Sequence, residues 1–395
     1  MSKARRHDGT KARRGATAVS AVRQSVAEVL ACLDRLAPFE YAAEWDNVGL
    51  LAGRRDWPAT RALLAIDLTD AVAHEVLKTR ADVLVLYHPP IFKGIRSVTP
   101  DAEGPTTLLP DLLAARVAIV ALHTALDAAP GGTNDILLDA FEPVERFPLE
   151  PLIRSGGRYK LVVFVPPKEV DKLRAALSAA GAGVIGHYTD CSFELRGRGT
   201  FRGDEATNPT VGRRLVLEHA DEIRLEMVLS RARLGDAVRA LYANHSYEEP
   251  AFDVYPLDEP VGRGAVGLGR VGVLRKPTRG TTLLERLRTT VDLSAALVVG
   301  DLKRRFRSVT AAAGAFGVRS FRDPDSLVLT GEFKHHEALE LLRRGITAVH
   351  LGHYASERPV LPVIRRHLME HIRGLRVEIA RADRAPFTPV AREAK

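Results

Sequence analysis

The chain has 395 residues and a mass of 43.1 kDa, a length that suggests two or three domains. Hydrophobic residues make up 46% and charged residues 27%, which excludes a fully disordered chain, a collagen-like repeat and a coiled coil. No stretch approaches the ~18–20 apolar residues that span a bilayer, so we expect no membrane protein. Two cysteines, Cys32 and Cys191, are too few for a disulfide framework or a Cys-based zinc site. The expected compartment is the reducing cytoplasm.

The positive charge is concentrated at the N-terminus. The net charge is +8, of which residues 1–17 carry +5 and the rest of the chain only +3. Residues 1–21 are polar and basic without periodicity, which predicts a disordered tail. The segment lacks the apolar core of a secretory signal. A solubilising tail is the favoured interpretation, and contact with nucleic acid or a transit peptide stays open.

A helix predicted over residues 25–36 is followed by apolar strands that alternate with helices. The strands are 61–67, 82–87 and 117–122, and the helices are 70–80 and 106–116. Continuous apolar strands in this alternation predict parallel βαβ units that are covered on both faces.

The pattern changes over residues 156–259, where the predicted order is βαββαβ. The strands are 160–165, 192–201, 222–230 and 251–257, and the helices are 168–181 and 234–245. This order predicts a ferredoxin-like insert domain.

The parallel pattern then resumes. The strands are 295–300, 307–313, 325–331, 346–352 and 375–380, and the helices are 332–345 and 356–372. The simplest interpretation is one parallel-sheet α/β domain, residues 22–155 and 260–384, interrupted by the insert. A short C-terminal tail, 385–395, completes the chain.

Histidines and carboxylates follow three of the predicted strands. His88 follows the second strand, His123 and Asp127 follow the third, and His353 and Glu357 follow a strand late in the chain. Because ligands bind beyond the carboxyl ends of parallel strands, we expect these side chains at one edge of one sheet.

The spacing of these residues suits a metal site. His123 and Asp127, like His353 and Glu357, are four residues apart, which places each pair on one face of a helix, ~5–6 Å apart at Cβ. Histidine and carboxylate ligands suit Zn, Mn, Fe or Co, and carboxylates can bridge two ions and lower the pKa of a bridging water. A single histidine is more often a hydrogen-bonded loop residue, but three converging strand ends favour a metal site.

Three other motifs favour a structural interpretation. His335 and His336 begin a predicted helix, where packing or support of a ligand is favoured over metal binding. Residues 261–272 contain G-x-G-x-x-G twice, but an extended segment follows, so a flexible return from the insert is favoured over a dinucleotide site. Residues 244–252, with His245, Glu248 and Glu249, are favoured as a helix-to-strand corner.

Five motifs in this order resemble the GTP cyclohydrolase I type II homologue family, also described as NGG-interacting-factor-like proteins with a dinuclear metal centre. They are AEWDNVGL, YHPPIF, HTALDAAPGGTND, TGEFKHHEAL and GHYASERPV. Residues 186–193, 197–203 and 246–257 resemble the PII/CutA-like insert that longer members carry.

The resemblance implies metal ligands at His88, Asp127, His353 and Glu357. Many members have two adjacent histidines where this chain has Tyr87 and His88. Because a tyrosine has a pKa of ~10, imidazole is the easier ligand, so we expect a weaker second metal position. The resemblance also implies two divalent ions per subunit and a ring-shaped hexamer with the metal sites facing its interior.

Two functional classes stay open. The first is a metal-dependent hydrolase acting on a purine nucleotide such as GTP or on a phosphoester, with Glu44 or Asp46 as proton acceptor or supporting partner of a ligand. The second is a non-enzymatic metal chaperone, store or sensor whose insert binds a small ligand. A nucleic-acid scaffold is disfavoured because the body of the chain is nearly neutral.

Overall fold

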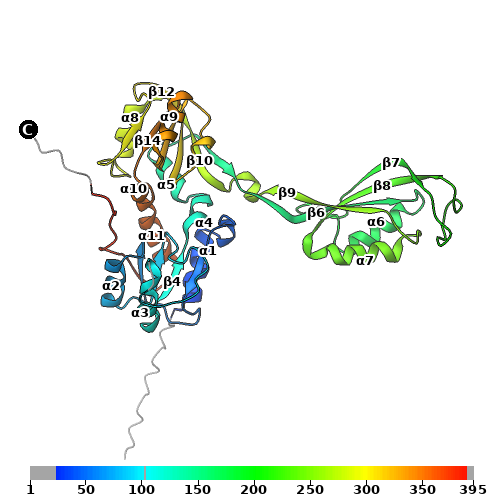
Figure 1. Ribbon diagram of the computed structural model, residues 1–395, viewed down its shortest axis with the longest axis horizontal. Helices are drawn as coiled ribbons and strands as arrows, with labels where there is room; N and C mark the ends of the chain where they lie inside the picture. Colours follow the sequence, from blue (N-terminus) through cyan, green and yellow to red (C-terminus); the bar gives the residue numbers. More distant parts are fainter. Residues whose placement is uncertain (1–23, 102–103, 389–395) are drawn as a thin grey trace, which may run out of the picture. The chain divides into compact units, whose positions relative to one another are not determined.

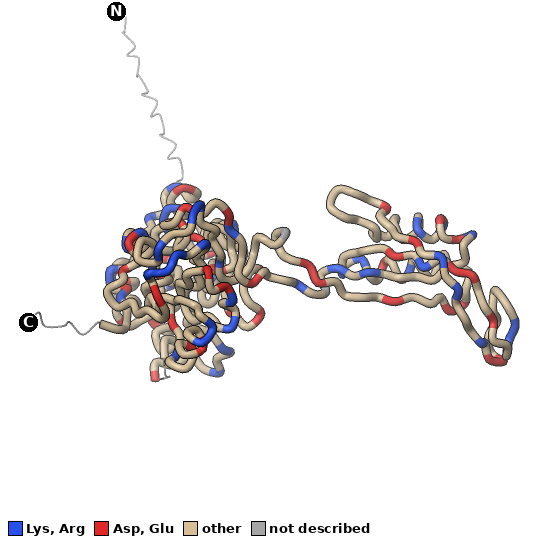
Figure 2. The backbone as a smooth tube through the Cα atoms, turned by 90° about the horizontal axis from the view of Figure 1, so that it is seen from above, with Lys and Arg blue, Asp and Glu red and all other residues tan. Residues whose placement is uncertain are grey.

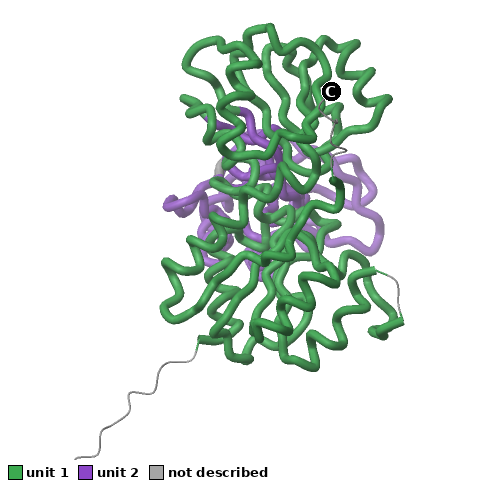
Figure 3. Tube along the Cα trace, turned by 90° about the vertical axis from the view of Figure 1, so that its left-hand side faces the viewer, with its two compact units in different colours: residues 1–145, 272–395 green, residues 146–271 purple. Residues whose placement is uncertain are grey.

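The computed structural model describes residues 24–101 and 104–388, which form two compact units. The first contains the chain up to Glu145 and from Gly272, and the second is Arg146–Val271 (Figure 3). The basic N-terminal tail and the last seven residues lie outside the described residues. In the described part of the chain, no helix has the length and apolar character needed to cross a membrane. Basic and acidic residues are interspersed along both units (Figure 2).

The first unit contains a five-stranded sheet in the order β1-β4-β3-β2-β15. Strands β2, β3, β4 and β15 are parallel, and β1 is antiparallel to β4. The strands are β1 (Gly49–Ala52), β2 (Arg61–Ala65), β3 (Val83–Leu86), β4 (Ala118–Ala121) and β15 (Arg376–Ile379).

Helices cover both faces of this sheet (Figure 1). Leu64 and Val85 pack in one core with α1 (Val26–Leu36) and α11 (Leu361–His371). Their neighbours Leu63 and Leu84 pack in another core with α2 (Asp70–Thr79) and α3 (Leu109–Ala114). Because successive strand residues point to opposite faces, burial of both faces explains the continuous apolar runs.

A second, six-stranded sheet has the order β11-β14-β13-β12-β10-β5. Strands β12, β13 and β14 are parallel, and β11 is antiparallel to β14. Helices α5 (Thr133–Asp139) and α8 (Gly280–Leu287) share its core, and α9 (His335–Arg343) connects β13 to β14. The strands are β5 (Glu145–Pro151), β10 (Gly267–Arg279), β11 (Leu297–Val299), β12 (Arg305–Ala315), β13 (Ser326–Glu332) and β14 (Thr347–His350).

The prediction of a single sheet in the α/β domain was therefore wrong. A buried apolar strand has the same composition whichever strand pairs with it, so the sequence does not reveal that the parallel strands divide between two sheets. The interpretation of residues 261–272 as a flexible return was also wrong in part, because residues from Gly267 onward form β10. A single 3-10 turn, Val261–Gly264, precedes β10, and no α-helix begins at these glycines, as a dinucleotide site would require.

The second unit has a four-stranded antiparallel sheet in the order β7-β8-β6-β9. Leu161, Val163 and Val165 of β6 alternate toward one face, where they share a core with α6 and α7. The elements are β6 (Ile153–Val165), α6 (Val170–Ala179), β7 (Ser192–Phe201), β8 (Glu218–Ser230), α7 (Leu234–Asn244) and β9 (Phe252–Pro260).

Candidate metal centre

The ends of three strands bring the predicted site residues together. Tyr87 and His88 follow β3, and His88 donates its main-chain N–H to Ile66 O at 3.0 Å. His123 follows β4 and begins α4 (His123–Ala128), with a φ of 31°. A left-handed φ in a non-glycine residue carries backbone strain, which proteins retain at functional sites among other places. Helix α10 (His353–Glu357) follows β14 of the other sheet.

His88, His353 and Glu357 form a tight group of possible metal ligands. The Nε2 atoms of the two histidines lie 3.4 Å apart. The Glu357 Oε2 atom lies 3.3 Å from His88 Nε2, and its Oε1 atom lies 3.2 Å from His353 Nε2. Glu357 is only 3% exposed, and its Oε2 lacks a hydrogen bond of good geometry within the described residues. A buried carboxylate with an unbonded oxygen requires a cation beside it, because an uncompensated buried charge is costly.

A carboxylate lies next to the second ring nitrogen, Nδ1, of each of these histidines. His88 Nδ1 lies 2.9 Å from Asp67 Oδ1, and His353 Nδ1 lies 3.3 Å from Glu332 Oε1. Metal-binding histidines usually donate their second ring N–H in this way, which fixes the ring orientation. Sequence reasoning missed both carboxylates, although Asp67 follows β2 and Glu332 ends β13, so both lie at strand ends as well.

Gly314 lies directly against the group. Its φ is +65°, and a Cβ atom at this position would lie 2.5 Å from Glu357 Oε1 and 3.5 Å from His353 Nε2. Its main-chain N–H donates to Ser356 Oγ at 2.9 Å. The Ser356 hydroxyl in turn donates to His353 O at 2.7 Å. The backbone of β12 thus leaves no room for a side chain beside Glu357.

Asp127 accepts a hydrogen bond from Tyr87 and does not belong to the tight group. The Tyr87 hydroxyl donates to Asp127 Oδ1 at 2.5 Å, and its oxygen lies 3.4 Å from Thr133 Oγ1. Burial, together with the charges of Asp127 and Glu357, raises the pKa of Tyr87 well above its usual value, so the phenol remains a neutral donor. Burial also raises the pKa of Asp127 to about 6, and the Glu357 charge adds to this shift.

His123 and Asp46 form a pair beside Asp127. The His123 ring centroid lies 5.3 Å from that of His88, which is itself 5.3 Å from that of His353. Asp46 Oδ1 lies 2.8 Å from His123 Nδ1, while Asp46 Oδ2 accepts hydrogen bonds from the Thr124 N–H and hydroxyl. Asp46 therefore positions His123. The other two predicted residues, Glu44 and His336, are exposed.

The three members of the tight group shift one another's protonation. Burial alone would lower the pKa of His88, but Asp67 and Glu357 outweigh it and raise the pKa to about 10. Glu357 also raises the pKa of His353. Burial opposes ionisation of Glu357, yet the two histidines hold its pKa below the usual value. Two oriented imidazoles and a buried carboxylate fit a divalent metal ion, which would replace the imidazole protons as the compensating charge.

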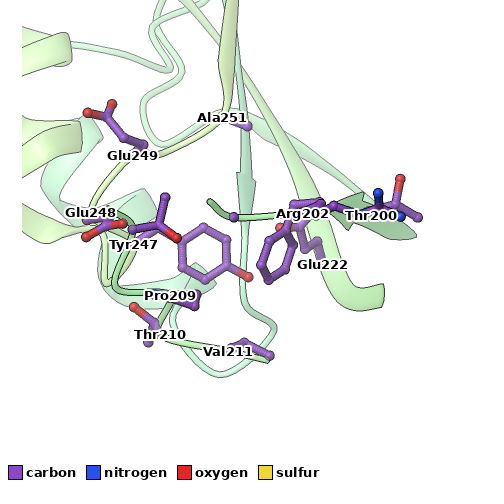
Figure 4. Close-up of a pocket in the computed structure, with 14 residues that line it drawn as sticks. Thr200, Arg202, Pro209, Thr210, Val211, Glu222, Tyr247, Glu248, Glu249 and Ala251 are labelled. Atoms are coloured by element: carbon purple, nitrogen blue, oxygen red, sulfur yellow. The ribbon is translucent and has the colours of Figure 1, made fainter. Parts of the chain in front are cut away.

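The second unit has a cavity of its own, of about 300 Å³. Phe201, Tyr247 and Glu222 line it together with Arg202 and Glu248 (Figure 4). Burial, together with the Glu222 charge, raises the pKa of Tyr247 to about 12. The cavity therefore combines aromatic surface with carboxylates, as small-molecule sites do.

Comparison with known proteins gives a consistent result. Residues 24–386 match the family DUF34/NIF3 (NGG1p interacting factor 3). A protein of Halalkalibacterium halodurans named GTP cyclohydrolase 1 type 2 homolog is 34% identical over 82% of this chain and 87% of its own length. A protein of the same name from Bacillus subtilis is 30% identical over 91% of this chain and 97% of its own.

Solved structures agree in fold. A Bacillus cereus protein described as related to NIF3 is 28% identical, covers 94% of this chain and all of its own, and has a TM-score of 0.62. A Staphylococcus aureus protein with the same coverage is 23% identical and has a TM-score of 0.69.

Proposed function

This chain belongs to the DUF34/NIF3 family, and from that premise we propose that it is a hydrolase dependent on two divalent metal ions. The family membership confirms the resemblance seen in the five sequence motifs. The proposed substrate class is a purine nucleotide or another phosphoester, in keeping with the name of the relatives. We place the protein in the cytoplasm, and we propose Zn, Mn, Fe or Co as the metal.

His88, His353 and Glu357 would hold one ion, since their ligand atoms lie within 4.8 Å of one another. Asp127 would hold the other together with Glu357, with His123 as a further donor. Glu357 would supply one oxygen to each ion, and its buried Oε2 has no hydrogen-bond partner of good geometry among the described residues, which leaves it available as a ligand. Tyr87 is assigned as the donor that orients Asp127, because its phenol is neutral and already bonded to that carboxylate.

When bound, the ions would supply Lewis-acid chemistry to a water molecule and to an oxygen of the substrate. Asp67 and Glu332 keep the two imidazoles facing Glu357, and Asp46 fixes the orientation of the His123 ring. Glu44 remains a candidate proton acceptor, because its carboxylate is exposed and it lies two residues before Asp46 in the sequence. Asp46 suits the supporting role better, since both of its oxygens already accept hydrogen bonds.

The convergence of His88, His353 and Glu357 carries the proposal, and metal analysis with a hydrolysis screen tests it. Purified wild-type protein should contain divalent metal and hydrolyse at least one nucleotide or phosphoester. His353→Ala and Glu357→Gln should each lose metal and activity. His336→Ala is the matched control, because His336 is an exposed histidine on α9. Full metal content in both site variants would overturn the metal assignment, and metal-loaded protein without hydrolysis would overturn the enzymatic one.

The cavity of the second unit favours one alternative, a metal-handling protein in which that unit senses a small ligand. We propose that the unit is a ferredoxin-like insert of the PII/CutA kind, spanning at least residues 156–259. The strand order β7-β8-β6-β9 with the element order βαββαβ supports this. A thermal-shift screen should then find ligands whose effect is lost in Tyr247→Ala. If no ligand acts through the cavity, the sensing role is wrong.

We also propose that the subunits form a hexameric ring, as the family resemblance implies. Mass measurement of the native complex in solution tests this, and a monomer at working concentration would contradict it.

A further inference from the structure

A second group of possible metal ligands lies where α1 packs against α11. It consists of Cys32, His367 and His371, each of which offers one ligand atom, and these three atoms lie within 4.8 Å of one another. We propose that this group binds a single zinc ion at a site separate from the His88 centre. The ion would connect α1 to α11 and so stabilise the contact between the two helices.

The two histidines share one face of α11. They are four residues apart, their ring centroids lie 4.3 Å apart, and the rings are inclined by 33°. Residues at this spacing on a helix are neighbours. Cys32 faces them from α1, whose packing against α11 belongs to the largest apolar core of the first unit.

The hydrogen bonds of both imidazoles suit metal binding. His367 Nε2 lies 3.0 Å from Cys32 O, and His371 Nδ1 lies 2.8 Å from His367 O. Because a carbonyl oxygen only accepts, each of these nitrogens carries the proton. The opposite nitrogen of each ring therefore keeps a lone pair. A metal-binding histidine usually has this arrangement, with its second N–H bonded to a carbonyl or carboxylate.

One thiolate and two imidazoles suit zinc, which takes sulfur and nitrogen ligands and accepts water in a fourth position. Two cysteines are too few for a zinc site made of cysteines alone, but one thiolate suffices when imidazoles complete the set. Cys32 is fully buried, whereas His371 is exposed, so the site opens to solvent on the histidine side. Binding would replace the S–H bond by a zinc–sulfur bond and release that proton to solvent.

Cobalt titration of the full-length apo-protein tests the proposal, because a cobalt–thiolate bond gives a near-ultraviolet charge-transfer band that histidine and carboxylate ligands do not give. Wild-type protein should show this band, and added zinc should abolish it. Cys191→Ser should keep the band, and Cys32→Ser should lose it. A Glu357→Gln variant, altered in the other centre, should also keep it.

Because Cys32 is buried, Cys32→Ser could misfold, and a second variant keeps the test decisive in that case. His371 is exposed, so His371→Ala should fold normally, and its cobalt Kd for the thiolate band should rise at least about 10-fold. His74→Ala, which removes an exposed histidine from α2, should leave that Kd unchanged. The proposal is overturned if wild-type protein shows no thiolate band, if the band persists in Cys32→Ser, or if His371→Ala binds as tightly as His74→Ala.

Discussion

Carboxylates beside His88 and His353 raise the pKa of both imidazoles, that of His88 to about 10, so both rings hold a proton more firmly than free imidazole does. A metal ion binds the neutral ring, so binding must release these protons. We therefore expect metal affinity to rise with pH below the raised pKa values, roughly tenfold per pH unit for each proton released. Calorimetry in two buffers of different ionisation enthalpy measures the number of protons. At metal concentrations high enough to load the weakened site, His353→Ala should release fewer protons, and an absence of buffer dependence in the wild-type protein would contradict the assignment.

Gly314 makes the tight group sensitive to a single methyl group. Gly314→Ala would place Cβ 2.5 Å from Glu357 Oε1 in a left-handed backbone conformation. We expect this variant to fold with reduced metal content, because Glu357 must move away from the two imidazoles. Gly317→Ala is the matched control, since no described atom lies within 4 Å of the added Cβ. Equal metal content in the two variants would show that Glu357 is not a ligand in this position.

Tyr87 donates to the partly buried carboxylate of Asp127, so its hydroxyl should matter for stability. Tyr87→Phe removes the hydrogen bond that the Tyr87 hydroxyl donates to Asp127 Oδ1. We expect the free energy of unfolding of the metal-free protein to fall by about 1–3 kcal/mol, measured by urea denaturation. Tyr41→Phe serves as control, because Tyr41 packs partly buried against the same core. An unchanged free energy of unfolding in Tyr87→Phe would mean that Asp127 is protonated and satisfied in another way.

At the scale of elements, α5 connects the two sheets of the first unit next to the site. Asn134 Oδ1 accepts the Ala313 N–H of β12 at 2.8 Å, and its amide donates to Asp127 O at 3.2 Å. Because Asn134 is buried, Asn134→Ala should reduce both stability, by about 1–3 kcal/mol, and metal affinity. Asn244→Ala, which removes a local bond on α7, should leave metal affinity unchanged. A loss of stability without a loss of affinity would show that α5 does not position the site.

The sequence predicted most elements of both units but not how they pair. The apolar runs 82–87 and 117–122 contain β3 and β4, and His353 and Glu357, four residues apart, begin and end α10. Short edge elements such as β1 were not predicted, because four residues with little alternation give no periodic signal. Asp67 and Glu332 were missed because nothing in their own segments marks them. Their role depends on histidines that other strands bring opposite them.

At the scale of the whole molecule, the second unit should be removable. Ser155 of β6 and Asp258 of β9 are paired residues of neighbouring strands, so a short turn could replace the segment between the two strands. Deletion of residues 158–257 should leave a first unit that folds and binds metal, since none of the proposed ligands lies in the deleted segment. Circular dichroism and metal analysis measure the outcome. A soluble, folded product without metal would show that the second unit contributes to the centre.

Strand β15 completes the first sheet by pairing with β2, and Arg376 lies opposite Arg61. During synthesis at ~5–20 residues per second, β2 therefore leaves the ribosome roughly 16–60 s before its partner. For that period the edge of β2 is an unpaired template for other chains. His353 and Glu357 also emerge late, so the ligand set of the centre is incomplete until most of the chain has been made. We expect nascent chains to depend on chaperones until the last strand is made, and truncation before β15 to cause aggregation even though every proposed ligand is present.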